Sequence, residues 1–367
     1  MEIENIIIEK ERKDEQIIAE VKSNKKSVCI YGCGDIGLNV HEFLEKNDIP
    51  VDFFIVDDKY YSPGNCKGLP VKKLSSILKK GNSLNLFIGF ADFNGALEKI
   101  KNINLNSQIF CISNPFTYLQ AYDLGAKFFL SQKSKFENAL SLFEDKLSKE
   151  IFIAYLNTRI NKNYKYMLPF NGCKTYFNNE IFTLSNDEVY IDCGAYNGDS
   201  VKSFLKNVNN KYKKIYAIEP DKKNFKKIEK FVSDNRIENI TLMNKGVWKE
   251  SAKLGFSDDG EQEGSITEEY TDNFIEVVSL DNTISSEKPT FIKFSVQGSE
   301  EDALLGTQNI IKNCHPKLAI TIFMKPDALI KIPQIIKSIN PHYKLYLRCE
   351  EAFFAKVILY AKAGENN

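Results

Sequence analysis

The stretch from Glu188 to Ser200, EVYIDCGAYNGDS, constrains the fold of this chain more than any other segment. A short run of apolar residues ends at Asp192, glycines follow at Gly194 and Gly198, and an amphipathic helical pattern begins directly afterwards. A strand, a glycine turn and a helix in this order are typical of the βαβ unit of a parallel sheet. We therefore expect an α/β domain around this segment.

The same pattern continues to the end of the chain. Seven apolar runs predict seven strands: EVYIDC, KKIYAIEPD, NITLMNKGVW, FIKFSVQ, KLAITIF, YKLYLR and AKVILYAKA. The last two runs are close together in the sequence, which predicts an antiparallel hairpin at the end of an otherwise parallel sheet. This ending favours a Rossmann-like methyltransferase sheet over a dehydrogenase sheet. A long insertion before FIKFSVQ has strand-like alternation at its ends.

A second, smaller βαβ pattern lies near the N-terminus, in SVCIYGCGDIGLNVHEFLEKNDIPVDFFIVDD. The runs LNLFIGF, SQIFCIS and AKFFLS predict further strands between helical stretches, as in an α/β domain. We therefore predict two Rossmann-like domains. The expected boundaries are a helical leader at 1–26, the first domain at 27–131, a helical connector at 132–179 and the second domain at 180–367.

Composition limits the class of protein. The 49 basic residues balance the 49 acidic residues, so charge gives no reason to expect a nucleic-acid partner. The charged N-terminus does not resemble a secretory signal, and no segment has the length of a membrane span. The eight cysteines are scattered without a CxxC pair, so we expect reduced thiols, no metal site and a cytoplasmic location. The frequency of dimers among such folds is the only ground for expecting a homodimer.

The residues after the first two strands of the second domain predict a cofactor site. Gly194 and Gly198 allow a tight turn that presents backbone N–H groups and a helix N-terminus to a polar ligand. Glu219 ends the next strand, where a carboxylate can accept hydrogen bonds from both hydroxyls of a ribose. Together these residues predict a ribose-containing cofactor at the carboxyl ends of a parallel sheet.

From about Tyr176 to Ala361 the sequence resembles the FkbM-type S-adenosylmethionine-dependent methyltransferases. The resemblance is carried by VYIDCGAYNGDSV, IYAIEPDKKNF, NKGVW, VVSLDNT and FIKFSVQGSEEDALLG, in that order. It implies S-adenosylmethionine as cofactor and usually a sugar or polyketide hydroxyl as acceptor. It also implies cofactor contacts, at the methionine end or the ribose, from Asp192, Gly194, Ala195, Tyr196, Gly198, Asp199, Glu219 and Gly246.

The sequence departs from this family where the acceptor is expected. Members generally read K-x-D-x-E-G-x-E on the fourth strand, whereas this chain has Lys293, Ser295, Gln297, Gly298 and Glu300. Where the family has a histidine before K-P, this chain has Met324, and Cys349, Glu350 and Lys356 stand where a histidine and a glutamate are common. Serine and glutamine cannot act as a general base and are poor sole ligands for a hard divalent cation. We take Lys293, Ser295, Gln297 and Glu300 as the candidate catalytic residues.

Three explanations of this departure remain open. The acceptor is more acidic than an alcohol, such as a carboxylate or phosphate-type oxygen, and is positioned by Lys293. Alternatively, the acceptor is a glycan hydroxyl and Glu300, Glu301 or Glu350 supplies the base. In the third case the domain binds a cofactor, or keeps only the fold, without methylating anything.

The first domain carries a glycine signature of its own. Gly32, Gly34 and Gly37 have the GxGxxG spacing, and Asp57 follows the next predicted strand, as in a dinucleotide or nucleotide-sugar site. The segment from Val28 to Pro70 resembles the small N-terminal domain of bacterial sugar acetyltransferases. Two interpretations stay open: a domain that binds a nucleotide-linked sugar, and a purely structural or dimerising domain.

These expectations combine into one hypothesis and one alternative. The hypothesis is an O-methyltransferase that uses S-adenosylmethionine to methylate a saccharide or nucleotide-sugar precursor of a surface glycan. The alternative is a non-catalytic protein of the same fold that senses or scaffolds the cofactor or a nucleotide sugar.

Overall fold

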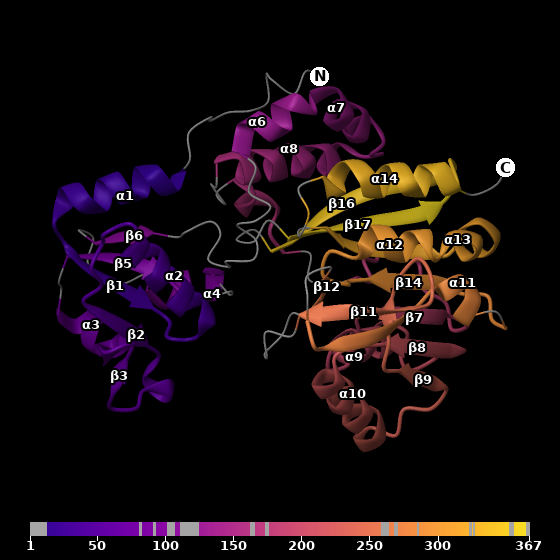
Figure 1. The fold of residues 1–367 in the computed structure, drawn as a ribbon, viewed down its shortest axis with the longest axis horizontal. Helices are drawn as coiled ribbons and strands as arrows, with labels where there is room; N and C mark the ends of the chain where they lie inside the picture. The colour runs from indigo at the N-terminus through magenta and orange to yellow at the C-terminus, as the bar shows by residue number, and fades with distance from the viewer. Residues whose placement is uncertain are drawn as a thin grey trace.

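Figure 1 shows the fold of the chain in a computed structural model. The structure describes residues 13–80, 83–90, 93–100, 107–110, 125–161, 166–172, 176–257, 264–267, 271–284, 286–322, 325, 327–351 and 356–364. Within them lie two larger sheets with separate hydrophobic cores, one from the N-terminal part of the chain and one from the C-terminal part, and a smaller four-stranded sheet. The predicted α/β fold class is confirmed.

The N-terminal sheet has six strands in the order β3-β4-β2-β1-β5-β6. Its pairs are parallel except for β3 with β4, which form a short antiparallel hairpin. The strands are β1 (Ser27–Tyr31), β2 (Phe53–Val56), β3 (Asn65–Cys66), β4 (Leu69–Lys73), β5 (Leu84–Ile88) and β6 (Gln108–Phe110). The helical segments are α1 (Lys13–Asn24), α2 (Asp35–Lys46), η2 (Asp58–Tyr60), α3 (Leu74–Lys80) and α4 (Phe93–Ile100).

This sheet is buried on both faces, because alternate side chains of its strands pack into two different cores. In β1, Cys29 and Tyr31 pack into one core, while Val28 and Ile30 pack into the core on the other face. Successive side chains of a strand point to opposite faces, so a strand buried on both sides reads as a continuous apolar run.

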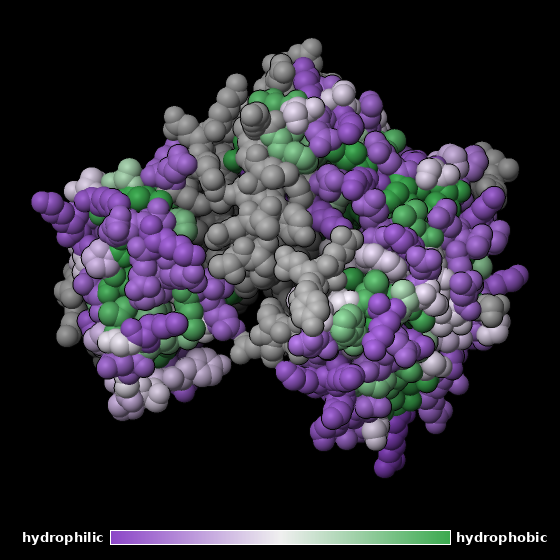
Figure 2. All heavy atoms as spheres, viewed as in Figure 1, coloured by the Kyte–Doolittle hydropathy of each residue, from purple (hydrophilic) through white to green (hydrophobic). Residues whose placement is uncertain are grey.

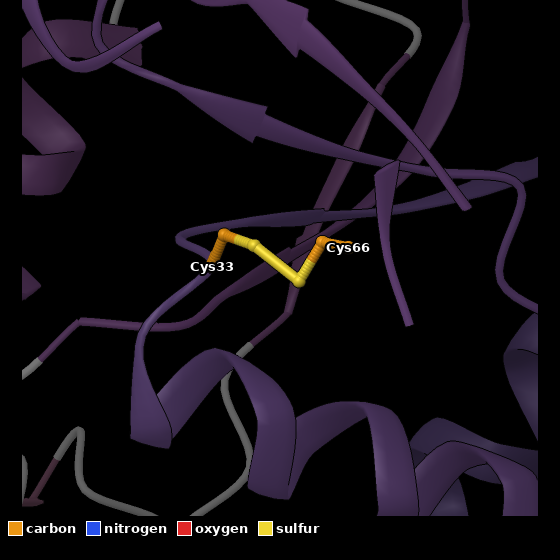
Figure 3. The surroundings of a disulfide bond; sticks show 2 residues. All are labelled: Cys33 and Cys66. Atoms are coloured by element: carbon orange, nitrogen blue, oxygen red, sulfur yellow. A yellow bond between two sulfur atoms is a disulfide. The ribbon is translucent and has the colours of Figure 1, made fainter. Parts of the chain in front are cut away.

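A disulfide joins Cys33, in the glycine loop after β1, to Cys66 in the β3–β4 hairpin (Figure 3). The expectation of reduced thiols is therefore wrong for this pair. The two cysteines are far apart in the sequence and carry no motif spacing, so only the approach of the hairpin to the loop brings them together. Cys29, Cys193, Cys314 and Cys349 are free thiols, and Cys111 and Cys173 lie outside the described residues.

The segment AKFFLS, for which we expected a strand, is part of helix α6 (Gly125–Ser131). Phe129 of this helix is buried against Phe136, with ring centroids 5.3 Å apart, in a helical layer formed with α7 (Lys133–Ser141) and α8 (Lys146–Asn161). Tertiary packing outweighs strand propensity in such a short apolar run. These helices share the C-terminal core, and α8 lies against strand β16.

The C-terminal sheet has seven strands in the order β16-β17-β15-β14-β7-β8-β9. They are β7 (Val189–Cys193), β8 (Lys214–Ile218), β9 (Ile240–Met243), β14 (Phe291–Phe294), β15 (Lys317–Ile322), β16 (Tyr343–Glu351) and β17 (Lys356–Ala363). Strand β17 is antiparallel to both β15 and β16, whereas the other pairs are parallel. The prediction of seven strands with a terminal antiparallel hairpin is confirmed.

Helices cover both faces of this sheet, as Figure 1 shows. Alternate residues of β14 again divide between two cores, with Phe291 in one and Ile292 and Phe294 in the other. The remaining helical segments are η4 (Leu168–Phe170), α9 (Asp199–Asn207), α10 (Lys222–Asp234), α11 (Leu280–Thr283), α12 (Glu300–Leu305), α13 (Gln308–Cys314) and α14 (Ala328–Ile339).

The insertion between β9 and β14 forms a small sheet of its own. Its strands are β10 (Gly246–Val247), β11 (Ala252–Ser257), β12 (Ser265–Thr267) and β13 (Phe274–Val278), in the order β10-β13-β11-β12. Phe256, Ile275 and Val277 form its buried core. The strand-like alternation noted in the sequence thus belongs to a second layer rather than to the main sheet.

The surface in Figure 2 is hydrophilic over most of the described residues, with apolar side chains in separate patches between the charged ones. None of the helices in the described part of the chain is long and apolar enough to cross a membrane.

Candidate functional site

A cavity of about 250 Å³ lies at the carboxyl ends of the C-terminal strands. Parallel strands β7, β8 and β14 all end at this edge, and antiparallel β17 begins there. Ligands of open α/β sheets bind in this position because the loops after parallel strands meet there. The lining includes Tyr176, Gly194, Tyr196, Asp199, Glu219, Asp221, Asn224, Lys245, Gly246, Val247, Phe256, Gly264, Ile266, Lys293, Ser295, Val296, Gln297, Ser299 and Lys356.

The glycine loop after β7 is held against the end of β14. Gly194 has φ +82°, and a Cβ atom built on it would lie 2.0 Å from the carbonyl oxygen of Ser295. A side chain cannot be accommodated at that distance, so this position requires glycine. Gly198, with φ +90°, then places the loop at the start of α9. Gly194, one of the two glycines that predicted a ligand loop, therefore also permits close backbone packing.

Asp192 and Lys293 form a buried ion pair beneath this loop. Asp192 has no exposed surface and Lys293 is 3% exposed, and the Nζ–Oδ1 distance is 3.0 Å. Ser200 donates a hydrogen bond to the other carboxylate oxygen of Asp192, and Lys293 donates one to the Gly194 carbonyl oxygen at 2.6 Å. These contacts hold the glycine loop in place.

The ion pair also settles the charge state of Lys293. Burial alone would lower the pKa of its ammonium, but Asp192 and then Tyr176 outweigh this effect and raise the pKa above the usual value. Lys293 is therefore protonated, and its charge is balanced within the protein. A protonated lysine whose charge is already matched is poorly suited to act as a base.

Glu219 follows β8 and faces the cavity from the other side of the loop. Its carboxylate accepts hydrogen bonds from the backbone N–H of Tyr196 at 2.8 Å and of Asp221 at 2.9 Å. Burial raises the pKa of this carboxyl to about 7, although the two backbone donors oppose the shift. A carboxylate oxygen has two lone pairs, so Glu219 can accept further hydrogen bonds from a ligand in the cavity.

The raised pKa predicts how pH affects stability. Because the folded-state pKa of about 7 exceeds the unfolded value of 4.5, the protein loses stability as Glu219 is forced to ionise with rising pH. We expect the free energy of unfolding of the wild type, relative to Glu219→Gln, to fall by about 2 kcal/mol from about pH 5 to about pH 8. Denaturant titrations at both pH values check this, with exposed Glu229→Gln as the control. Equal pH dependence in wild type and Glu219→Gln would contradict it.

The four candidate catalytic residues are in different settings. Lys293, Ser295 and Gln297 line the cavity, and Gln297 has a left-handed backbone with φ +50°. Glu300 is not among the lining residues. It is buried, and its two carboxylate oxygens accept hydrogen bonds from the backbone N–H groups of Val296 and Gly298, both at 3.0 Å. The carboxylate of Glu300 is therefore bound to the backbone of the turn that directly precedes it.

The expected cofactor residues also divide into two groups. Gly194, Tyr196, Asp199, Glu219 and Gly246 line the cavity. Asp192, Ala195 and Gly198 are buried behind this surface, where they shape the loop.

At the far end of the cavity, beyond β14, Lys356 and Tyr176 complete the lining. Lys356 begins β17 and forms an ion pair with Glu350 of β16 at 3.0 Å. The hydroxyl of Tyr176 lies 3.4 Å from that of Thr321, and the Lys293 ammonium lies 5.1 Å from the centre of the Tyr176 ring. Met324, which replaces a histidine of the family pattern, lies outside the described residues.

Sequence reasoning missed the residues that the insertion adds. Phe256 of β11, Ile266 of β12 and Gly264, which directly precedes β12, line the cavity. The apolar alternation in this segment was visible, but nothing in a local pattern indicates that a separate sheet folds over the cavity. Tyr176 was likewise missed, because it precedes the domain's first strand by a long loop.

Among the described residues, no group of three or more His, Cys, Asp or Glu side chains could hold a metal ion.

In the N-terminal domain, two glycines of the GxGxxG pattern, Gly32 and Gly37, are required for close packing of the backbone. A Cβ on Gly32 would lie 2.3 Å from the Gly89 carbonyl oxygen, and one on Gly37 would lie 2.3 Å from that of Gly32. Gly34 is the N-cap residue of α2, and a Cβ atom built on it would have no neighbour within 4 Å. These contacts account for two of the glycines without a ligand.

Asp57, the expected ribose partner of that domain, already has two partners. Tyr31 donates a hydrogen bond to one carboxylate oxygen, and Lys99 donates one to the other. Burial works against the charge, but these two hydrogen bonds hold the pKa of Asp57 below its usual value. A ligand at this domain stays a prediction.

Comparisons with known proteins found one matching family model and several similar solved structures. Residues 192–342 match the family model described as the methyltransferase FkbM domain. No curated protein matches the chain. A crystal structure of methyltransferase FkbM from Methylobacillus flagellatus KT is similar to this chain at 21% identity and a TM-score of 0.70, covering 95% of this chain and 92% of that one.

Two other solved structures are similar over about half of the chain. A rRNA methylase from Streptococcus thermophilus has 18% identity and a TM-score of 0.33, covering 49% of this chain and 89% of that one. A putative methyltransferase from Streptococcus mutans in complex with SAH has 15% identity and a TM-score of 0.34, covering 50% and 92%. The family match is confined to residues 192–342, and the similarity of fold to the methyltransferase FkbM structure extends over 95% of this chain.

Proposed function

We propose that the C-terminal domain binds S-adenosylmethionine in the cavity and transfers its methyl group to an oxygen atom of a saccharide or nucleotide-sugar acceptor. The observation that carries this proposal is the placement of Glu219. Its buried carboxylate lies at the end of β8 beside a glycine loop that Lys293 and Asp192 hold in place. A carboxylate in this position is suited to accept hydrogen bonds from the hydroxyls of a ribose.

The composition of the cavity lining supports this proposal. Gly246, Val247 and Ile266 offer an apolar surface for a base at the β8 side, next to the carboxylate of Glu219. The loop at Gly194 and Tyr196 lies between this surface and β14, where the methionine part would be held. Bound there, S-adenosylmethionine would supply an electrophilic methyl group.

The protein's own residues would contribute by positioning the acceptor next to the methyl group. Ser295, Gln297 and Tyr176 line the cavity beyond the loop, where an acceptor would meet the methyl group. Holding two reactants in a productive geometry can itself supply a large part of a rate enhancement. The saccharide class of the acceptor rests on the family resemblance and on the polar lining at this end.

Calorimetric titration with S-adenosylhomocysteine tests the proposal. We expect saturable binding with one site per chain. Turnover is then measured as transfer of labelled methyl groups from S-adenosylmethionine to sugar acceptors. Absence of S-adenosylhomocysteine binding by the folded protein would overturn the proposal. Binding without transfer to any oxygen acceptor would favour a cofactor-binding protein without catalytic activity.

A further inference from the structure

The disulfide between Cys33 and Cys66 lies in the N-terminal sheet, outside the cavity to which the proposed methyl transfer is assigned. It joins the loop after β1 to the β3–β4 hairpin, as Figure 3 shows. The two cysteines are 33 positions apart, and α2, β2 and η2 lie between them. The role of this bond is therefore independent of the proposed function.

The disulfide is accessible to dissolved reagents. Cys33 and Cys66 are both partly exposed, and the residues on either side of Cys66 and the residue after Cys33 are exposed. Exposed disulfides are the ones that thiols reduce most readily. By contrast, three of the free thiols are buried: Cys29, Cys193 and Cys349.

The hairpin that carries Cys66 is weakly held by backbone pairing. Strand β3 has two residues and stands at the edge of the sheet, where its neighbour is β4. One of its two residue pairs is Asn65 with Pro70, and proline has no N–H group to donate. The pairing of β4 with β2 begins only at Val71. Residues 64–70 can therefore move away from the loop after β1 without disrupting the parallel sheet, once the disulfide is broken.

The position of Cys33 favours cleavage of the bond. Cys33 directly precedes Gly34, the N-cap residue of the 12-residue helix α2. The partial positive charge at a helix N-terminus stabilises a thiolate, and a stabilised thiolate is the better leaving group. Two exposed charges adjoin the cysteines in sequence, Asp35 in the first turn of α2 and Lys67 after Cys66, and their signs are opposite. We therefore expect an incoming thiol to attack Cys66 and Cys33 to leave.

We propose that Cys33 and Cys66 form a reversible thiol–disulfide site, which exchanges with low-molecular-weight thiols and their disulfides. The oxidised site fastens the β3–β4 hairpin to the loop after β1, and the reduced site releases it. Ligands of open α/β sheets bind at the carboxyl ends of such strands. The bond therefore determines whether the hairpin stays against a loop of that kind.

The exchange balances in two steps. The thiolate of a small thiol attacks the Cys66 sulfur and forms a mixed disulfide, while the bond between the two cysteine sulfurs breaks and its electron pair stays on Cys33. A second small thiolate then attacks the small thiol's sulfur in the mixed disulfide, and the electron pair of that bond stays on Cys66. Two small thiols are oxidised to one disulfide, and their two protons pass to Cys33 and Cys66.

The first test uses the wild-type protein in glutathione buffers that range from fully reduced to fully oxidised. Free thiols are trapped by alkylation, and the cysteines are mapped by mass spectrometry. We expect Cys33 and Cys66 to change together from alkylated to linked, with a midpoint inside this range. Cys314, a partly exposed free thiol, is the matched control and should not become linked to another cysteine. The far-UV circular dichroism spectrum should be the same in both states.

The second test measures the release of the hairpin by amide hydrogen exchange. We expect exchange in residues 64–70 to be about tenfold faster or more in the reduced protein, because the cross-link no longer limits local opening. Exchange in β14 should be equal in both states. The double substitution Cys33→Ser with Cys66→Ser should give the fast exchange in either buffer.

The third test separates the roles of the two cysteines. In Cys66→Ser the remaining thiol of the pair is Cys33, and in Cys33→Ser it is Cys66. We expect iodoacetamide to alkylate Cys33 severalfold faster than Cys66 at neutral pH, since the thiolate is the reactive form. Oxidised glutathione should leave a mixed disulfide on Cys66 in Cys33→Ser.

Several results would overturn the inference. A pair that stays linked in fully reduced glutathione, or that unfolds the protein when it is reduced, is a structural disulfide. A pair that stays unlinked in oxidised glutathione, or that links to other cysteines, is not a disulfide site of this kind. Equal hydrogen exchange of the hairpin in both states would show that the bond does not hold it. Alkylation of Cys33 no faster than that of Cys66 would contradict its role as leaving group.

Discussion

Replacing Lys293 with methionine is expected to lower the free energy of unfolding of the C-terminal domain by about 3–5 kcal/mol. The substitution leaves the Asp192 carboxylate, which has no exposed surface, without its counter-ion, and it removes the hydrogen bond to the Gly194 carbonyl. Burial of an unmatched charge is costly because the protein interior cannot solvate it. Denaturant unfolding of the wild type and Lys293→Met measures the difference.

Two controls separate this effect from a general loss of charge. Lys213→Met removes an ion pair of similar length, with Glu287 at 2.9 Å, but at an exposed site, so it should cost less than about 1 kcal/mol. The double substitution Asp192→Asn with Lys293→Met should recover part of the stability lost in Lys293→Met. A cost in Lys293→Met no larger than in Lys213→Met would show that the pair does not hold the loop.

Replacing Glu219 with alanine is expected to weaken the binding of S-adenosylhomocysteine about a hundredfold or more. The wild-type carboxylate would accept hydrogen bonds from two ribose hydroxyls, and each hydrogen bond to a charged group contributes about 1.5–3 kcal/mol. The variant also loses the acceptor for the backbone N–H groups of Tyr196 and Asp221. Calorimetry gives the affinities directly.

The matched control is Glu229→Ala, which removes an exposed glutamate from α10 outside the cavity lining. Its affinity for S-adenosylhomocysteine should equal that of the wild type. Glu219→Gln should fall between wild type and Glu219→Ala, because an amide oxygen still accepts one hydrogen bond. Wild-type affinity in Glu219→Ala would exclude a ribose at this carboxylate.

Much of the C-terminal fold could be predicted because its local signals agree with one another. The run ending in Asp192, the glycine turn and the amphipathic α9 each favour the same βαβ unit, and the closely spaced last two strands predict the hairpin. Parallel strands buried on both faces are long continuous apolar runs, which is a strong signal in a sequence.

The errors occur where contacts between distant segments decide the outcome. The run AKFFLS favours a strand by composition, but its phenylalanines complete a helical layer that no local pattern announces. The Cys33–Cys66 disulfide depends on a hairpin that approaches the glycine loop. Neither can be derived from spacing along the chain.

The residues of the candidate site also divide into those that local sequence patterns predict and those that depend on contacts between distant segments. Glu219 and the glycine loop could be identified from sequence, since their positions follow from the ends of adjacent strands. The sequence did not indicate that the Glu300 carboxylate binds the backbone of the turn before it, or that Lys356 of an antiparallel strand lines the cavity. Both facts depend on how the side chains are placed in the folded protein.

The cofactor site at Glu219 is tested most directly by a crystal structure of the complex with S-adenosylhomocysteine. We expect the ribose hydroxyls to lie on the Glu219 carboxylate, the base to lie between the insertion and β8, and the sulfur to be directed toward Ser295 and Gln297. A ligand bound elsewhere, or bound in the cavity with the ribose away from Glu219, would contradict it.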